Sequence, residues 1–503
     1  MFDFNNFIYS EKSPLLFTQS AFWVFFFVVY LIHNILYKEN KLKNIFLTIF
    51  SFYFYYLSSG FYVILLLIST LIDFYIGKKI YLTDEPKKRK ELMILSLVSN
   101  LTLLGFFKYT YFFTDIFNQI FKKNIEVFNP INYFLNLIFN SDYNVNEIIL
   151  PVGISFYTFQ TISYTVDIYR NKLKPVDSLW DFAFFVSFFP QLVAGPIVRA
   201  SEFIPQIFQK FELRKEEFSK AYFLILTGLV KKIFLSDYIS VNIVDRVFES
   251  PSEYTGIENL MGVYGYALQI YCDFSGYTDI AIGISLLLGF KLPLNFNSPY
   301  KAENITDFWR RWHISLSSWL RDYLYIPLGG NRNGVFNTYK NLIITMLLGG
   351  LWHGAHLRFI IWGALHGVAL SFHKFYSEKL QNSYFYKKTP KWISIIITFN
   401  FVCFCWIFFR SESMEIAFSV IEQIVFNFRL DLIVDILITR KLVIMVLLIG
   451  FLMHFMPYNL KNKLLESFSK LPDFTKATIT LILIIFLYQV KSSDLQPFIY
   501  FQF

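Results

Sequence analysis

Long apolar runs alternate with short polar, often basic, segments along the whole chain. A helix that crosses a bilayer needs about 20 apolar residues, and many of these runs approach that length. We predict apolar segments at residues 15–37, 44–57, 61–77, 92–113, 147–168, 179–198, 219–235, 257–272, 278–290, 340–372, 392–409, 434–457 and 473–490. The pattern predicts an all-α polytopic membrane protein with about 11 transmembrane helices plus re-entrant and interfacial helices.

Composition favours a membrane protein over a soluble one. Hydrophobic residues fill 55% of the 503 positions and charged residues only 17%, against roughly 25% in soluble domains. No repeat or composition shift marks a separate unit, so we predict a single membrane domain over residues 1–503, with a motif-bearing core at about 150–373. Residues 1–14 lack a basic region and a small-residue cleavage site, so we expect the run at 15–37 to be a retained spanning helix.

Basic residues follow the first, third and fifth runs, and the chain carries a net charge of +9. If the runs at 44–57 and 61–77 form a hairpin, the positive-inside rule places these basic loops in the cytoplasm and the N-terminus outside. Their positions between spans indicate orientation and contact with lipid headgroups, and do not suggest nucleic-acid binding. The residues are Lys38, Lys41, Lys43, Lys78, Lys79, Lys87, Lys88, Arg89, Lys90, Arg170, Lys172 and Lys174.

Turn-forming residues interrupt two of the runs. Pro190 and the pair Gly195-Pro196 predict that the run at 179–198 is re-entrant. The run at 340–372 is too long for one crossing, and Gly349-Gly350 predicts a break in it. Broken helices at membrane depth are tolerated only where they line a cavity inside the protein, so we expect such a cavity.

An amphipathic helix is predicted from residue 304 to residue 323, with Asn304 or Thr306 as its cap. Basic residues and tryptophans on one helix are typical of the membrane surface. His313 is the exception, because it lies on the aromatic face of this helix. That face carries Trp309, Trp312, His313, Leu316, Trp319, Leu320 and Tyr323, and another face carries Arg310, Ser317 and Arg321.

Three of the seven histidines lie in the apolar stretch LGGLWHGAHLRFIIWGALHG at residues 348–367. On a continuous helix His353 and His356 share a face, and His366 lies further round it. Ionisable residues inside a membrane segment are costly and mark functional sites. Three roles stay open: a metal ligand, a proton relay, or a general base, since imidazole has an ordinary pKa of about 6.5 and can accept a hydroxyl proton. With no HExxH pattern or acidic residue at ligand spacing, we expect no metal site.

A second polar cluster interrupts the apolar run at residues 271–283, YCDFSGYTDIAIG. Its two carboxylates, Asp273 and Asp279, are costly inside a membrane unless they face a cavity or a partner. The cluster therefore either contributes to packing between helices or lines the expected cavity.

Several stretches form a recognisable set: GPIVR at 195–199, DFSGYTDIAIG at 273–283, FNSPY at 296–300, FWRRWHISLSSWLRDYLYIPLGGNR at 308–332 and GGLWHGA at 349–355. Together they resemble the membrane-bound O-acyltransferase (MBOAT) family, and within it the bacterial branch of alginate and peptidoglycan O-acetyltransferases. The resemblance implies a ring of membrane helices around a central tunnel. It implies that the enzyme transfers an acyl group to a hydroxyl, with His353 of the WHG motif and His313 of the RWH motif as the catalytic residues.

The resemblance also implies the substrates. The donor would be cytoplasmic acetyl-CoA or a related thioester, with no permanently bound cofactor, and the acceptor an extracytoplasmic cell-envelope polysaccharide. A separate SGNH hydrolase-like protein would complete the transfer outside, and the chain would lie in the bacterial inner membrane.

Further residues are candidates for substrate contact. Guanidinium groups match phosphate geometry, so Arg310, Arg311 and Arg321 are candidates for the CoA phosphates, although contact with lipid headgroups would explain them equally well. The remaining candidates are Trp352, Asp273 and His356.

Two other functions compete with the enzyme. A transporter or flippase would use the histidines as a proton relay, but such proteins often show repeat symmetry between halves, and here the polar motifs cluster in the second half. A non-catalytic scaffold for a partner enzyme would tolerate loss of His353.

Overall fold

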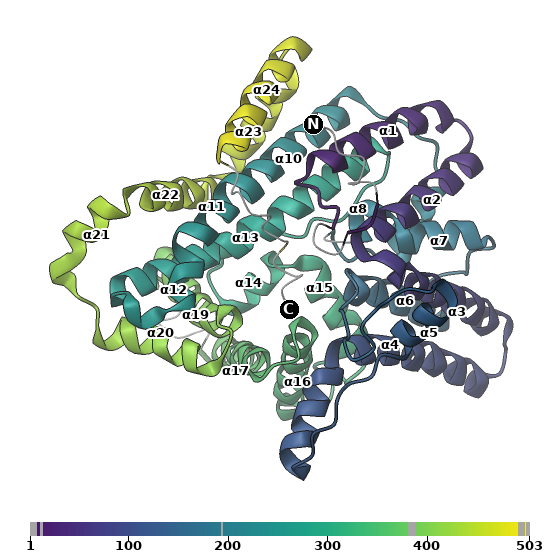
Figure 1. The fold of residues 1–503 in the computed structure, drawn as a ribbon, viewed down its shortest axis with the longest axis horizontal. Helices are drawn as coiled ribbons and strands as arrows, with labels where there is room; N and C mark the ends of the chain where they lie inside the picture. The colour runs from purple at the N-terminus through teal and green to yellow at the C-terminus, as the bar shows by residue number, and fades with distance from the viewer. Residues whose placement is uncertain (1–7, 11–13, 193–194, 381–388, 491–497, 499–503) are drawn as a thin grey trace.

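The computed structural model describes residues 8–10, 14–192, 195–380, 389–490 and 498. Every regular element in these ranges is a helix, which confirms the all-α prediction. Figure 1 shows the short helices α14 and α15 near the centre, with α10 and α13 above them, α16 and α17 below, and α2, α3 and α6 to the right.

The N-terminal helices are α1 (Ser20–Leu36), α2 (Asn40–Ser59), α3 (Val63–Leu82), α4 (Pro86–Phe121), α5 (Pro130–Phe139), α6 (Ile154–Tyr169), α7 (Leu179–Ser187) and α8 (Phe189–Leu192). The middle of the chain forms α9 (Ala200–Ile207), α10 (Lys215–Leu229), η3 (Val230–Ser236), α11 (Asp237–Ile239), η4 (Ser240–Val244), α12 (Asp245–Glu249), α13 (Gly256–Leu287), α14 (Ile305–Arg311), α15 (Ile314–Leu320) and η7 (Arg321–Tyr325). The C-terminal helices are α16 (Val335–His353), α17 (Leu357–Leu380), α19 (Lys391–Arg410), α20 (Met414–Phe426), α21 (Ile433–Thr439), α22 (Lys441–Phe455), α23 (Tyr458–Lys470) and α24 (Asp473–Val490).

Several of these helices can cross a membrane. Within the described residues, four segments are long and apolar enough: Asn40–Leu82, Pro86–Phe121, Lys391–Arg410 and Asp473–Val490, or five if the bent pair α22 and α23 is one span. Other long helices have too low a mean hydropathy to meet the same criterion. Helix α13, for example, is buried along most of its length but contains Asp273 and Asp279. The figure of about 11 spans therefore stays a prediction.

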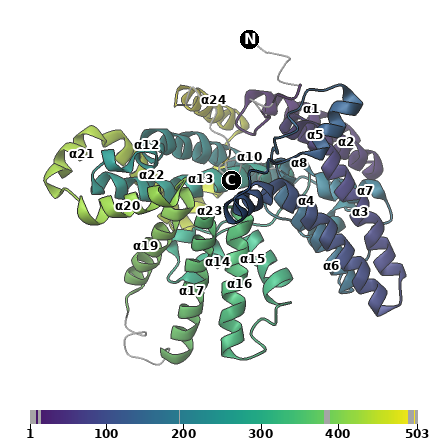
Figure 2. The same ribbon diagram turned by 60° about the horizontal axis from the view of Figure 1, so that its bottom comes forward.

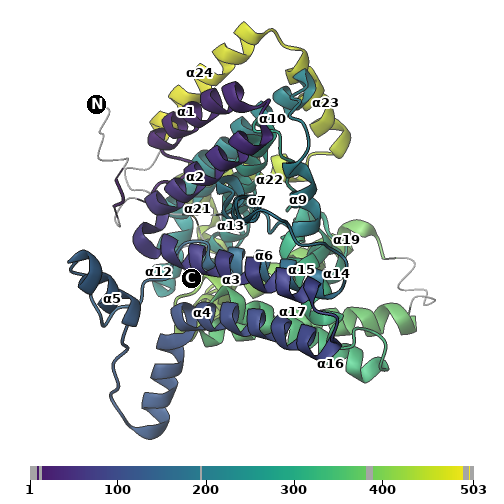
Figure 3. The same cartoon turned by 90° about the vertical axis from the view of Figure 1, so that its right-hand side faces the viewer.

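Two N-terminal expectations can be compared with these elements. Helix α1 occupies most of the run at 15–37, while residues 1–7 and 11–13 of the preceding stretch lie outside the described residues. The run at 179–198 is interrupted, because α7 ends at Ser187 and α8 is one turn that contains Pro190, and its re-entrant path stays a prediction. Residues 193 and 194 of the same run also lie outside the described part. Figure 3 shows α3, α4 and α6 side by side on the flank of the molecule.

Helices α10 and α13 cross in close contact at a pair of glycines. A Cβ on Gly228 would lie 2.6 Å from the carbonyl oxygen of Gly276, and a Cβ on Gly276 would lie 2.8 Å from that of Gly228. Small residues at such a crossing let two membrane helices approach closely. Gly276 of the DFSGYTD motif therefore serves helix packing.

The carboxylates of that motif are held by lysines of η3. Lys232 lies 2.6 Å from Asp273, and both side chains are only 2% exposed. Lys231 lies 2.5 Å from Asp279. The sequence left open whether these carboxylates contribute to packing between helices or line a cavity. In the structure each carboxylate has an ion-pair partner on a neighbouring packed helix, so both contribute to packing.

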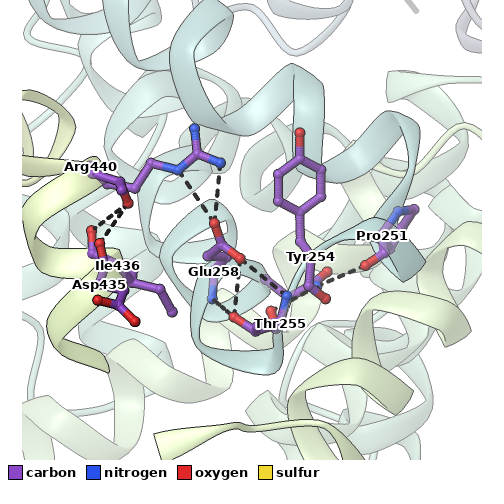
Figure 4. A network of polar contacts seen from close by, with 9 residues as sticks. Pro251, Tyr254, Thr255, Glu258, Asp435, Ile436 and Arg440 are labelled. Atoms are coloured by element: carbon purple, nitrogen blue, oxygen red, sulfur yellow. Dashed lines mark hydrogen bonds and ion pairs between the residues drawn. The ribbon is translucent and has the colours of Figure 1, made fainter. Parts of the chain in front are cut away.

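The start of α13 is fixed by a polar network (Figure 4). The Oγ1 atom of Thr255 accepts a hydrogen bond from the backbone N–H of Glu258 at 3.3 Å, and the Glu258 carboxylate accepts one from the backbone N–H of Thr255 at 3.2 Å. This capping box satisfies N–H groups that a helix start otherwise leaves open. Arg440 donates two hydrogen bonds to the same carboxylate, which ties α13 to the start of α22.

Candidate active site

His313 lies at a break between two short helices, and not on one continuous helix as predicted. Helix α14 ends at Arg311, His313 has a φ of 42°, and α15 begins at Ile314. The extended residues before α14 stabilise the break: Asn297 donates its N–H to the carbonyl of Arg311, and Ile314 donates its N–H to the carbonyl of Asn295, both at 2.9 Å. The break leaves His313 fully buried.

The side chain of Asn295 orients the His313 imidazole. Its Oδ1 atom accepts hydrogen bonds from the backbone N–H of Ser315 at 3.2 Å and from the Ser315 hydroxyl at 2.9 Å. These donors identify that atom as the oxygen, so the Nδ1 atom of His313, at 3.1 Å, must donate to it. The Nε2 atom of a neutral His313 is then a hydrogen-bond acceptor.

His353 is the last residue of α16. The predicted break at Gly349-Gly350 is wrong, because the helix continues through both glycines and ends at His353. Gly350 serves close packing on α17: a Cβ on it would lie 2.2 Å from the carbonyl oxygen of Phe359, and a Cβ on Gly363 of α17 would lie 2.4 Å from that of Met346, whereas a Cβ on Gly349 would lie 3.3 Å from Leu320 Cδ1 of α15. Figure 2 shows α16 and α17 running side by side.

An aromatic cage surrounds the His353 imidazole, which is 4% exposed. Its ring centroid lies 5.0 Å from that of Trp352, 5.1 Å from Trp362 and 5.2 Å from Phe409. The Trp352 ring also lies 6.2 Å from the His313 ring. The structure thus brings the two predicted catalytic histidines to one indole, although they are 40 residues apart in the sequence.

Of the other two histidines of this stretch, His356 lies in a turn, and His366 lies against the aromatic cage, on Trp362. His356 is exposed in the turn between α16 and α17, so it shares no helix face with His353. His366 is buried in α17, where its Nδ1 atom accepts a hydrogen bond from Trp309 Nε1 at 3.3 Å. Its ring also packs on Trp362, with centroids 4.7 Å apart.

A series of ring contacts leads from Trp352 to a group of arginines. Trp352 stacks on Phe159 at 5.4 Å, Phe159 on Trp319 at 3.8 Å, and Trp319 packs on Tyr323 at 5.2 Å. The Tyr323 ring lies under two guanidinium groups, Arg170 at 5.4 Å and Arg199 at 5.7 Å. We call Arg170, Arg199 and Arg321 the arginine cluster.

Asp322 holds the arginine cluster together. Arg199 lies 2.6 Å and Arg321 2.7 Å from its carboxylate, and Arg170 donates to its backbone carbonyl at 3.2 Å. Burial raises the pKa of Asp322, but the hydrogen bonds from Arg321 and Arg199 outweigh it and hold the pKa below its ordinary value. Asp322 is therefore ionised at neutral pH and neutralises only part of the cluster's charge.

The three arginines predicted to bind phosphate are divided between two places. Arg321 belongs to the arginine cluster, whereas Arg311 on α14 is paired with Asp307 at 2.9 Å. Arg310 is exposed on α14. Arg170 and Arg199 were missed as candidates, although Arg199 ends the GPIVR motif and Arg170 belongs to a basic loop. Asn295, just before FNSPY, was also missed.

Comparison with known proteins agrees with this geometry. Residues 172–418 match the family described as "MBOAT, membrane-bound O-acyltransferase family", a range that includes both histidines. A peptidoglycan O-acetyltransferase from Helicobacter pylori is 40% identical over 416 residues, which is 77% of this chain and 75% of the relative. A probable alginate O-acetylase AlgI from Pseudomonas aeruginosa is 39% identical over 409 residues, 81% of this chain and 74% of the relative.

A teichoic acid D-alanyltransferase from Bacillus subtilis is a more distant relative, 33% identical over 285 residues, 53% of this chain and 70% of the relative. The chain belongs to the membrane-bound O-acyltransferase family. It is accordingly an enzyme that transfers acyl groups to oxygen, which confirms the enzyme hypothesis over the transporter and the scaffold.

Proposed function

We propose that this enzyme lies in the bacterial inner membrane and moves an acetyl group from a cytoplasmic acetyl-CoA-type thioester toward hydroxyls of an extracytoplasmic cell-envelope polysaccharide. An SGNH-type extracytoplasmic protein completes the transfer. The names of the two closer relatives support both the acetyl group and the class of polymer. The observation that carries the proposal is the burial of His353 and His313 against the same Trp352 indole.

His353 acts as the general base. Its imidazole removes the proton from an acceptor hydroxyl while that oxygen attacks the thioester carbonyl carbon. A carbon–oxygen bond forms, the carbon–sulfur bond breaks, and the imidazolium returns its proton to the departing thiolate. The aromatic cage of Trp352, Trp362 and Phe409 supports this role because it excludes water, which would otherwise compete for the acyl group.

His313 positions the acceptor. Because its Nδ1–H is donated to Asn295, its Nε2 atom accepts a hydrogen bond and can hold a second hydroxyl of the acceptor, which leaves the proton of the attacking hydroxyl to His353. The same tautomer cannot donate to the oxyanion that forms on the thioester carbonyl. His313 therefore orients the nucleophile, and the charge on the oxyanion is stabilised by other groups.

The arginine cluster binds the donor's phosphates. Arg89 of α4, in a loop predicted to be cytoplasmic, donates to the carbonyl of Tyr169 beside the cluster at 3.2 Å. Phe159 lies eleven residues before Arg170 along α6, a distance of about 16 Å on a helix. A donor whose thioester is carried on a long flexible arm can therefore bind with its phosphates at the arginine cluster and its carbonyl near His353. The arm would then run along the ring series that joins the two places.

The test compares ester-linked acetate on isolated envelope glycans from cells that carry the wild type, His353→Ala or His356→Ala at matched membrane levels. We expect acetate to disappear with His353→Ala and to persist with His356→Ala, whose side chain is exposed. The same membranes are then supplied with labelled acetyl-CoA, and wild-type membranes should release CoA in step with ester formation. Full acetylation by His353→Ala would refute the general-base assignment.

A further inference from the structure

A basic pocket lies away from His313 and His353, where α2 and α10 begin and α13 ends. Its volume is about 270 Å³, and Lys43, Lys210, Arg214, Lys291, Gln206 and Phe211 are among the residues that line it. The backbone around it is closely fitted: Lys291 donates its N–H to Gln206 Oε1 at 2.7 Å, and a Cβ on Gly289 would lie 2.3 Å from Phe211 Cδ2. The pocket is thus part of the packed fold.

Lys43 gives the pocket an unusual electrostatic character. The side chain is 2% exposed, and its Nζ atom donates to Asn40 Oδ1 at 3.2 Å and lies 5.6 Å from the Phe290 ring. Among the residues that the structure describes, no carboxylate lies within ion-pair distance of Lys43 or Lys210. Burial of a cation is costly unless an anion accompanies it.

Two acidic residues line the pocket, Glu217 and the exposed Glu212, and in the described part of the chain neither lies within ion-pair distance of Lys43. Glu217 is bound to Lys291 at 3.0 Å and to Arg214 at 3.3 Å, and Lys291 holds the pKa of this carboxyl below its ordinary value. The starts of α2 and α10 add positive partial charge. The opposing negative end of α13 is largely satisfied, because Phe290 and Gly289 donate to the carbonyls of Ser285 and Leu286.

Exposed apolar residues flank the pocket. Leu42, next to Lys43, is 53% exposed and Phe208, next to Gln209, is 56% exposed, and Asn40 Nδ2 donates to the Phe208 carbonyl at 3.5 Å. Such apolar side chains beside a basic pocket fit acyl chains that continue from a phosphate. We propose that the pocket binds the headgroup phosphate of an anionic phospholipid from the cytoplasmic leaflet, with Lys43 as its buried contact and Lys210 and Arg214 at its rim.

The experiment titrates the purified protein in an uncharged detergent with phosphatidylglycerol, phosphatidylcholine and inorganic phosphate, and measures bound ligand by native mass spectrometry. We expect phosphatidylglycerol to bind more tightly than phosphatidylcholine. Each positive charge removed from the pocket should weaken the binding of phosphatidylglycerol about fivefold. Lys43→Gln removes one charge, and the double variant Lys210→Gln/Arg214→Gln removes two, so the double variant should weaken binding more. The matched control is Lys122→Gln/Lys123→Gln, which removes two exposed cations outside the basic loops assigned to lipid headgroups and should leave binding unchanged.

Because Lys43 is buried, its variant can fail to fold, and the exposed rim variant then decides the question. Equal binding of phosphatidylglycerol by the rim variant, the control and the wild type would overturn the proposal. Inorganic phosphate that binds the wild type and displaces phosphatidylglycerol at equal concentration would also overturn it, because the site would then take a free phosphate and not a lipid.

Discussion

The Nζ atom of Lys108 donates a hydrogen bond to the backbone carbonyl of His353 at 3.0 Å. Lys108 belongs to α4, 245 residues earlier in the chain, and its ammonium also lies 5.9 Å from the Trp352 ring. The carbonyls in the last turn of a helix have no partner within it, and a cation there is also favoured by the helix dipole. Lys108 therefore fixes the end of α16 from which the imidazole of His353, the proposed general base, projects.

We predict that Lys108→Met lowers kcat by about 5- to 100-fold while KM changes little, since loss of a charged partner of a buried carbonyl costs about 1–3 kcal/mol. Lys108→Arg should recover most of the rate. Tyr109→Phe is the matched control, because Tyr109 donates to the neighbouring Leu351 carbonyl at 2.8 Å. A fall in membrane level without a fall in kcat would show that Lys108 serves folding alone.

Asn295 provides a second test of positioning. We predict that Asn295→Ala lowers kcat by about tenfold or more, because His313 loses the acceptor that fixes its tautomer. The control is Ser315→Ala, which leaves Asn295 in place as the acceptor for His313. This variant removes only the Ser315 hydroxyl, which accepts a hydrogen bond from the N–H of Ile197 at 3.0 Å, so it measures the cost of loosening this segment alone. Equal loss of rate in both variants would contradict a specific role for Asn295.

The sequence predicted the membrane class and both catalytic candidates, because long apolar runs and the WHG and RWH motifs are local features. It did not predict the break at His313, since helical spacing continues through Trp312 and His313 and only the distant Asn295 and Asn297 bonds end the helix. Gly349 and Gly350 suggested a break for the same reason, because their close neighbours in space, Leu320 and Phe359, cannot be seen in a local pattern. Lys108 was missed although it is an ionisable residue inside the predicted span at 92–113, because the sequence gave no sign of its partner, the carbonyl of His353.

The ion pair between Lys231 and Asp279 allows a stability prediction. Both side chains are mostly buried, at 19% and 16% exposure. Removing one member of a buried pair costs about 3–5 kcal/mol, whereas apolar replacement of both is often neutral. We predict that Lys231→Met and Asp279→Leu each lower the thermal unfolding temperature of the purified protein, and that the double variant lies closer to the wild type. A double variant less stable than both single variants would indicate that the two residues act separately.

The candidate phosphate-binding arginines lie in two separate places, the arginine cluster and α14. Kinetic measurements can therefore show which place binds the donor. If the arginine cluster binds the donor's phosphates, Arg321→Gln should raise KM for acetyl-CoA by about 5- to 20-fold, the loss expected for about 1–2 kcal/mol of charge-assisted hydrogen bonding. The effect on kcat should be small, because Arg321 lies beyond the ring series from His353. Arg310→Gln is the matched control, an exposed arginine of the same motif on α14. A rise in KM with Arg310→Gln and none with Arg321→Gln would instead place the phosphates at α14, on the opposite side of the break at His313.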